Sequence, residues 1–194
     1  MSPPPRDTAP LPKDRGMSRF AIRRYAMKDV VEIHEAALES REHVSRWMGW
    51  NTSGYDRVAC EQWVAQCMQA WKGGTSYEHV MVDTRTEALV GAGGINMINT
   101  ADKVANMGYW VRTSWLGRGV ATRAALLLRD FAFRELGLVR VEIVVAEGND
   151  ASRRVAEKTG ASYEGVRRAR LQVQGRAVDA HMYALINEQA LMEE

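Results

Sequence analysis

Three strand-like segments follow one another through the middle of the chain, and this succession restricts the fold most. They run from Ser76 to Asp83, from Ala88 to Met97 and from Val104 to Val111. Neighbours of this kind pair as antiparallel hairpins. A later strand, with apolar residues alternating from Val139 to Val145, is reached only through a helix, as parallel pairing requires. The chain must therefore build a mixed sheet with helices on its faces.

Helical periodicity and stop signals place the remaining elements. Helices are expected at Lys28 to Ser40, Glu42 to Trp47, Arg57 to Trp71 (before Gly73-Gly74), Val120 to Leu136 (before Gly137) and Asp150 to Thr159 (before Gly160). Further strands are expected at Arg19 to Tyr25, Ser162 to Arg168 and Arg176 to Ile186. The predicted class is α/β (α+β), with a mostly antiparallel central sheet of about six to seven strands.

The domain organisation follows from length and proline content. All five prolines fall within the first 12 residues, so residues 1–18 are expected to form a flexible leader, in which Met17 is an alternative start. Residues 19–194 are long enough for one core and are predicted to form a single domain.

Composition excludes several classes of protein. Lys and Arg number 26 against 24 Asp and Glu, so charge alone does not favour nucleic acid. Without an apolar run of about 18 residues or a signal peptide, the protein is expected to be soluble and cytoplasmic, with no membrane partner. Four scattered His and two Cys predict no metal site. Cys60 and Cys67 are about 10.5 Å apart along a helix, too far for a disulfide, and are expected to be reduced side chains that face the core or a partner.

A glycine-containing turn links the strand ending at Val111 to the next helix. Gly117-Arg118-Gly119 leaves several backbone N–H groups free at the positive end of the helix dipole. Such a turn binds phosphate, and glycine lets the backbone approach the oxygens. It lacks the third glycine of a dinucleotide fingerprint and the Gly-Lys-Ser/Thr of a P-loop, so alone it is also compatible with an ordinary helix start.

Three motifs together resemble the GNAT superfamily of acyl-CoA-dependent N-acetyltransferases. They are Gly108-Tyr109-Trp110-Val111, Leu116-Gly117-Arg118-Gly119-Val120-Ala121, and Asn149-Asp150-Ala151-Ser152 with Gly160. The turn is similar to the family signature Gln/Arg-x-x-Gly-x-Gly/Ala, although Leu116 stands where Gln or Arg is usual. Over residues 19–186, Glu39-Ser40-Arg41-Glu42, Trp47-Met48-Gly49-Trp50 and Glu164-Gly165 with Gly175 and Asp179 resemble the RimJ/RimL-type branch, which includes ribosomal-protein N-terminal acetyltransferases.

The resemblance implies how acetyl-CoA, the expected co-substrate, would bind. The strand ending at Val111 and the strand from Val139 would splay apart, with the pantetheine arm in the gap. Its amides would pair with backbone groups on that first strand, and Asn149 would bond it where the next helix begins. The expected coenzyme-binding residues are Tyr109, Trp110, Val111, Gly117, Arg118, Gly119, Val120, Ala121, Thr122, Asn149 and Ser152.

The resemblance also implies direct transfer of the acetyl group to an amine. The N–H of Val111 would stabilise the oxyanion. Many GNAT enzymes carry a Tyr seven residues after the motif Asn, but Ala156 occupies that position here, and Ser152 is the expected replacement as the group that assists the leaving thiolate. No base is assigned. Glu78 and His79 are neighbours on a strand and point to opposite faces of the sheet, and the sequence leaves open which of them faces the site.

The resemblance implies an amine as the acceptor, and a protein N-terminus is one candidate. Arg41, Trp47 and Trp50 are candidate acceptor-side residues, although the tryptophans could equally lie in the core. A small-molecule amine, such as an antibiotic or polyamine, and a non-catalytic coenzyme A-binding module are the alternatives. A basic cluster is either a solvated face or a surface for an acidic partner: Arg167, Arg168, Arg170 and Arg176. A homodimer is left open.

Overall fold

The computed structural model describes residues 19–50 and 54–192, and the predicted leader, residues 1–18, lies outside them. One seven-stranded sheet has the order β1-β2-β3-β4-β5-β7-β6. The strands are β1 (Phe20–Arg24), β2 (Tyr77–Asp83), β3 (Leu89–Asn99), β4 (Val104–Val111), β5 (Arg140–Ala146), β6 (Ser162–Val173) and β7 (Arg176–Ile186). The three successive segments do pair as antiparallel neighbours, which confirms the mixed, mostly antiparallel sheet.

The only parallel pair in the described sheet is β4 with β5. Register pairing holds for Val104 to Asn106 against Arg140 to Glu142. Beyond these residues β4 continues to Val111 and β5 to Ala146, and the two strands diverge. The splay implied by the resemblance is therefore present, and it opens toward the carboxyl ends of both strands.

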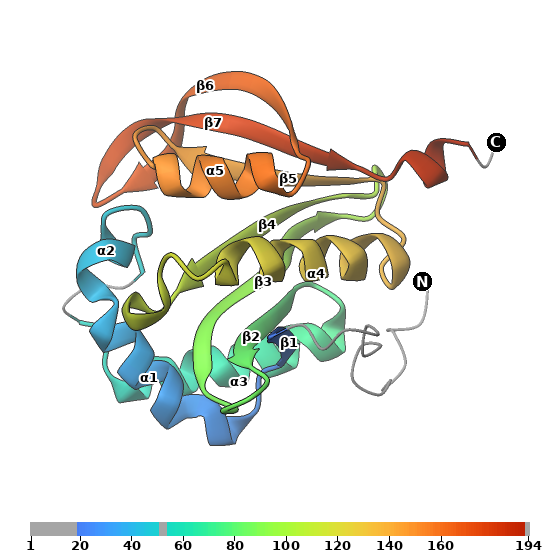
Figure 1. Cartoon of the computed structure of the whole chain (residues 1–194). Helices are drawn as coiled ribbons and strands as arrows, with labels where there is room; N and C mark the ends of the chain where they lie inside the picture. The colour runs from blue at the N-terminus through green and yellow to red at the C-terminus, as the bar shows by residue number, and fades with distance from the viewer. Residues whose placement is uncertain (1–18, 51–53, 193–194) are drawn as a thin grey trace.

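Helices cover both faces of the sheet (Figure 1). The long helices are α1 (Val30–Glu39), α3 (Arg57–Gly73), α4 (Val120–Arg134) and α5 (Asp150–Lys158). α1 and α3 contribute to one core with Val80, Leu89 and Ala92. α4 and α5 contribute to a larger core on the opposite face. Short segments complete the chain: α2 (Arg41–Ser45), η1 (Met27–Asp29), η2 (Thr113–Trp115) and η3 (Glu188–Leu191).

The buried stripe of α3 consists of Cys60, Val64, Cys67 and Trp71, at the spacing of one helical face. Both thiols are free and buried, so both side chains face the core. Within residues 19–50 and 54–192, no helix is both long and apolar enough to cross a bilayer.

The observed element boundaries lie within two residues of the sequence-based expectation, except at the end of β6. Helix α4 ends at Arg134, two residues early, and Gly137 with φ of 63° lies in the following turn. Strand β6 runs to Val173 instead of Arg168, because a bulge interrupts its alternation without ending it. At the bulge Ala169 has φ of 50°, and its N–H donates to Asp179 Oδ1 at 2.8 Å.

Candidate functional site

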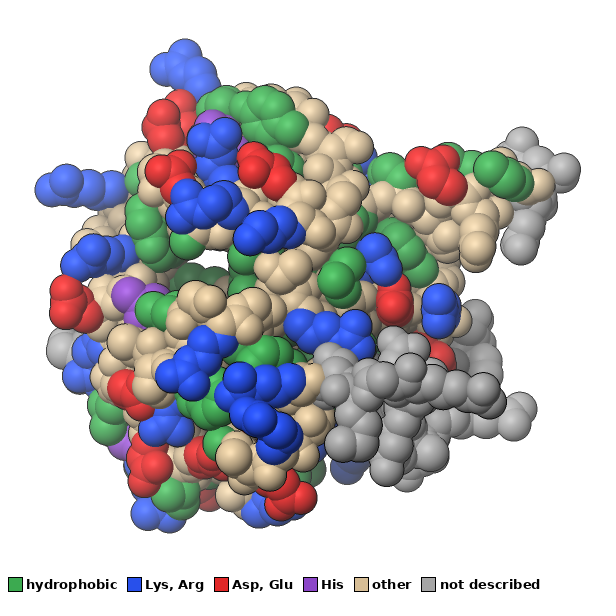
Figure 2. Space-filling model, viewed as in Figure 1, with side chains coloured by type: hydrophobic (Ala, Val, Ile, Leu, Met, Phe, Trp, Pro, Cys, Tyr) green, Lys and Arg blue, Asp and Glu red, His purple; other side chains and the backbone are tan. Residues whose placement is uncertain are grey.

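A cleft of about 200 Å³ lies where β4 and β5 diverge. β4 lines it from Met107 to Val111 and β5 from Ile143 to Ala146, with α2 and α5 at its sides. In Figure 2 the surface is hollowed here, with apolar side chains in the hollow and Lys and Arg side chains around its rim. The diverging strands leave backbone groups on β4 without a partner on β5, so the cleft suits an extended chain that carries amides.

The glycine turn lies beside this cleft at the start of α4. Gly117 and Gly119 have φ of 72° and 77°, which favours glycine at both positions. Gly119 is the N-cap residue and offers no side chain to accept from the first turn of α4. A Cβ built at either glycine has nothing within 4 Å, so the space in front of the turn is open. These features suit a helix N-terminus that binds a phosphate group.

The segment before the turn is fastened to the end of α1. Glu39 Oε1 accepts from the N–H of Ser114 at 2.7 Å, and its other oxygen accepts from Arg112 Nε at 2.5 Å. The hydroxyl of Ser40 accepts from the N–H of Thr113 at 3.1 Å. Glu39 and Ser40, at the end of α1, therefore hold the segment that leads into the glycine turn.

Asn149 and Ser152 lie at the start of α5, on the rim of the cleft. Asn149 Oδ1 accepts from the N–H of Ser152 at 3.1 Å, so Asn149 is an N-cap and also lines the cleft. The Ser152 hydroxyl lies 3.0 Å from the hydroxyl of Tyr109 on β4. Burial raises the pKa of Tyr109 to about 12, against the opposing bond to Ser152, so its proton stays in place at neutral pH.

The Tyr109 hydroxyl is a candidate site group that the sequence reasoning missed, since it used only the backbone of this residue. Ala156, at the position where many GNAT enzymes carry a Tyr, is fully buried in the core and brings no hydroxyl to the cleft. A hydroxyl from β4 thus stands beside Ser152.

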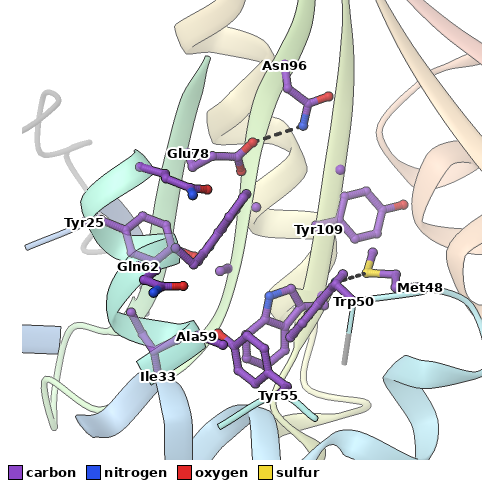
Figure 3. A pocket seen from close by; sticks show the side chains of 16 residues that line it. Tyr25, Ile33, Met48, Trp50, Tyr55, Ala59, Gln62, Glu78, Asn96 and Tyr109 are labelled. Atoms are coloured by element: carbon purple, nitrogen blue, oxygen red, sulfur yellow. Dashed lines mark hydrogen bonds between the residues drawn. The ribbon is translucent and has the colours of Figure 1, made fainter. Parts of the chain in front are cut away.

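A second, larger cavity of about 450 Å³ lies on the α1 and α3 face of β4. It shares Met48, Gly108, Tyr109 and Trp110 with the cleft, so the two spaces meet at β4. Aromatic side chains from separate elements form much of its wall: Tyr25, Trp50, Tyr55, Trp63 and Trp110. Figure 3 shows Glu78 and Asn96 at one end of this cavity and Tyr55 with Ile33 at the other.

The structure fixes the phase of Glu78 and His79. Glu78 lines the larger cavity, and Asn96 Nδ2 donates to its Oε1 at 3.0 Å. His79 points to the opposite face, where its ring centroid lies 4.8 Å from that of Trp71 and 5.0 Å from that of Phe131. Burial lowers the pKa of His79 to about 3, so this neutral core imidazole is not a candidate base.

The other candidate residues for the acceptor side lie in different places. Trp50 lines the larger cavity, whereas Trp47 lines the cleft. Arg41 lines neither space, and its guanidinium donates to the carbonyl of Tyr55 at 3.3 Å. The arginine cluster lies on the edge strand β6 and on β7, where Arg167, Arg168 and Arg176 are exposed and Arg170 is half-buried.

Comparison with known proteins agrees with this geometry. The sequence model described as an acetyltransferase (GNAT) domain matches residues 19–162, well over half of the chain. The chain belongs to the GNAT acetyltransferase family. It is therefore an acyltransferase, an N-acetyltransferase that transfers to an amine.

Individual GNAT relatives are similar across nearly the whole chain. YdaF of Bacillus subtilis (strain 168), provisionally named a ribosomal N-acetyltransferase, is 27% identical over 88% of this chain and 92% of its own. Mycobacterium smegmatis RimJ, solved with a CoA-disulfide, is 25% identical with a TM-score of 0.79, covering 88% and 83% of the two chains. RimL, a ribosomal L7/L12 α-N-protein acetyltransferase solved with coenzyme A, is 21% identical with a TM-score of 0.81, covering 87% and 94%. At that identity the RimL likeness concerns the fold.

Proposed function

We propose that this GNAT enzyme transfers an acetyl group from acetyl-CoA to a primary amine, with a protein N-terminal α-amine as the acceptor. The observation that carries the proposal is the meeting of two spaces at β4. An open phosphate-binding turn and a splayed cleft suit a long thioester, and an aromatic cavity on the other side of β4 suits its acceptor.

The residues around the cleft fit acetyl-CoA by their chemistry. The amides of Gly117, Arg118, Gly119, Val120, Ala121 and Thr122 would hold the pyrophosphate, because they surround an open helix N-terminus. Backbone groups of Tyr109, Trp110 and Val111 would pair with the pantetheine amides as an added strand. Asn149 would bond the same arm while it caps α5.

Acetyl-CoA supplies the activated acetyl thioester. The N–H of Val111 would stabilise the oxyanion that forms at its carbonyl. The pair of hydroxyls on Ser152 and Tyr109 would donate to the sulfur as it leaves. If Tyr109 donates to Ser152 Oγ, the Ser152 proton is available for the thiolate, so the two groups form one donor chain.

The names of the relatives support a protein N-terminus as the acceptor. YdaF is named for the ribosome, and the name of RimL specifies α-N-acetylation of the ribosomal protein L7/L12. A chemical argument agrees, since an α-amine has a pKa of about 8 and loses its proton more easily than a lysine amine. A small-molecule amine is the second candidate, favoured by the aromatic walls of the larger cavity.

One assay tests the proposal and separates the two acceptors. Release of free coenzyme A from acetyl-CoA would be followed with peptides that begin with Ser, Ala or Met, with a diamine and with an aminoglycoside. We expect turnover with peptides and mass increase at the peptide N-terminus. Turnover with the diamine or aminoglycoside alone would replace the protein acceptor by a small molecule. An absence of turnover with every amine, in a protein that binds acetyl-CoA, would contradict acetyl transfer to these acceptor classes.

A further inference from the structure

The larger cavity carries a single formal charge. Its described lining contains no Lys, Arg or His, and its one acidic residue is Glu78. The remaining polar side chains at the wall are the amides Gln62, Gln66 and Asn96 and the hydroxyls of its tyrosines. A cavity with aromatic walls and one carboxylate attracts a cation and offers an anion no opposite charge.

Two glycines clear a path from this carboxylate toward the cleft. Glu78 on β2 is in register with Gly94 on β3, and Gly94 is in register with Gly108 on β4. A Cβ at Gly94 would collide with the Glu78 carboxylate, so the side chain lies directly over the glycine. A Cβ at Gly108 would meet nothing within 4 Å. Adjacent strands are about 4.8 Å apart, so the register row Glu78–Gly94–Gly108 spans roughly 10 Å from β2 to β4. The Glu78 side chain extends along this row toward β4.

A chain of amides fixes the orientation of the carboxylate. Asn106 Nδ2 donates to Asn96 Oδ1 at 2.9 Å, and Asn96 Nδ2 donates to Glu78 Oε1 at 3.0 Å. The three residues come from β4, β3 and β2 and lie on one face of the sheet. Because a carboxylate can only accept, Asn96 directs its amide nitrogen to Glu78 and its amide oxygen to Asn106. Glu78 therefore accepts a hydrogen bond at Oε1.

Other ionisable groups near Glu78 come from β1 and α3. Burial raises the pKa values of Tyr25 and Cys67, so both are neutral at physiological pH. Arg24 and Lys72 line a smaller cavity of about 130 Å³, which Glu78 also borders. The guanidinium of Arg24 stacks on Trp71 at 4.3 Å from the ring centroid. Burial raises the pKa of Glu78 as well, which makes the carboxylate a stronger base than an exposed one.

We propose that Glu78 binds the ammonium group of the acceptor and takes its proton. The cavity then accepts amines whose remaining part is apolar and carries no carboxylate. This inference rests on the proposed acetyl transfer. One proton moves from the ammonium nitrogen to a Glu78 oxygen, which frees the lone pair. The nitrogen then forms the C–N bond to the acetyl carbon, the thioester C–S bond breaks, and the sulfur takes a proton from the Ser152–Tyr109 pair. A second proton leaves the nitrogen to solvent as the amide forms. The hydroxyl pair regains its proton from solvent, and Glu78 releases the first proton to solvent.

The predicted selectivity follows from the single charge. A free amino acid would bring a carboxylate into a space whose lining has no cation to pair with it. A polyamine would bring several charges against one carboxylate. An N-terminal residue of a protein has an amide where the free amino acid has its carboxylate, so it brings an ammonium group without a negative charge beside it.

Glu78→Gln tests the role of the carboxylate, since glutamine keeps the shape and can still accept from Asn96. With 2-phenylethylamine as acceptor, kcat/KM should fall about 10²-fold or more, while the Kd for acetyl-CoA and the melting temperature stay close to wild type. Glu61→Gln, which removes an exposed carboxylate from α3, is the matched control and should keep wild-type kcat/KM. Equal kcat/KM in wild type and Glu78→Gln would overturn the proposal.

A matched set of probes tests the selectivity in the wild-type enzyme. 2-Phenylethylamine and L-phenylalaninamide should be acetylated, and L-phenylalanine, which differs by a carboxylate, should have a kcat/KM at least tenfold lower. Comparable turnover of L-phenylalanine, or a strong preference for spermidine, would overturn the assignment of the cavity. A wild-type enzyme that acetylates none of these but acetylates a peptide would restrict the site to polypeptide acceptors and overturn the predicted acceptance of small amines. If the wild-type enzyme acetylated neither these amines nor any peptide, the proposed acetyl transfer itself would be contradicted.

Discussion

The hydroxyl oxygens of Tyr109 and Ser152 lie 3.0 Å apart, although the two residues are 43 positions apart in the sequence. They come from β4 and α5, two elements that border the cleft, and so they connect its opposite sides. The carbonyl oxygen of Ser152 lies 3.3 Å from the same Tyr109 hydroxyl and is an alternative acceptor for its single proton. A donor that serves a leaving thiolate would therefore be a pair of hydroxyls and not a single side chain.

The first prediction concerns this pair. Ser152→Ala and Tyr109→Phe should each lower kcat by about 10²-fold, since proton donation acts mainly in the transition state. The Kd for acetyl-CoA should change little. The double variant should have nearly the same kcat as either single variant, because the two hydroxyls act as one proton-donating unit and removing either one disables it. The cycle is measured as kcat under saturating amine, with calorimetric Kd and melting temperature.

A threefold or smaller fall in kcat for Ser152→Ala, with chemistry rate-limiting, would remove Ser152 from this role. A Tyr109→Phe variant that alone loses activity would assign the proton to the tyrosine. A fall in melting temperature without a change in kcat would make the pair structural.

The sequence predicted the parts of this site that depend on local order. The start of α5 after Asn149, the glycines of the turn and the core-facing cysteines of α3 each depend on residues close together in the chain. The Tyr109 hydroxyl could not be predicted, because its position depends on how α5 packs against β4. Glu78 and His79 show the same limit, since the phase of a strand is set by which face meets which helix.

The second prediction concerns the phosphate-binding turn. Gly119→Val should weaken acetyl-CoA binding at least tenfold, which corresponds to about 1.4 kcal/mol, because a side chain would keep phosphate away from the backbone. Gly137→Val is the control, since Gly137 also has a positive φ and open space but lies beyond the other end of α4. Both variants carry similar backbone strain, so only the first should change the calorimetric Kd. Equal Kd values in the two folded variants would contradict the turn's assignment.

The third prediction concerns pH and His79. Burial lowers its pKa in the folded protein to about 3, below the ordinary value of 6.5. The unfolded chain therefore takes up a proton that the folded protein does not, and stability falls as pH drops below 6.5. Denaturant unfolding between pH 7 and 4.5 should show this loss. His79→Phe should have a flatter profile, and an unchanged slope in that variant would show that other groups cause it.

The last prediction concerns the bonds that fasten the turn to α1. Glu39 is the acceptor for both the N–H of Ser114 and the guanidinium of Arg112, and glutamine in its place would lose the charge that strengthens both bonds. Because Ser114 lies three residues before Gly117, the approach to the turn should become looser, and part of the binding energy would be spent on ordering it. Glu39→Gln should therefore weaken acetyl-CoA binding about three- to tenfold, with little change in kcat at saturating coenzyme. Glu35→Gln removes an exposed carboxylate from the same helix and should leave the Kd unchanged. If both variants weaken binding equally, the effect would come from the net charge of α1; if neither does, the turn keeps its shape without Glu39.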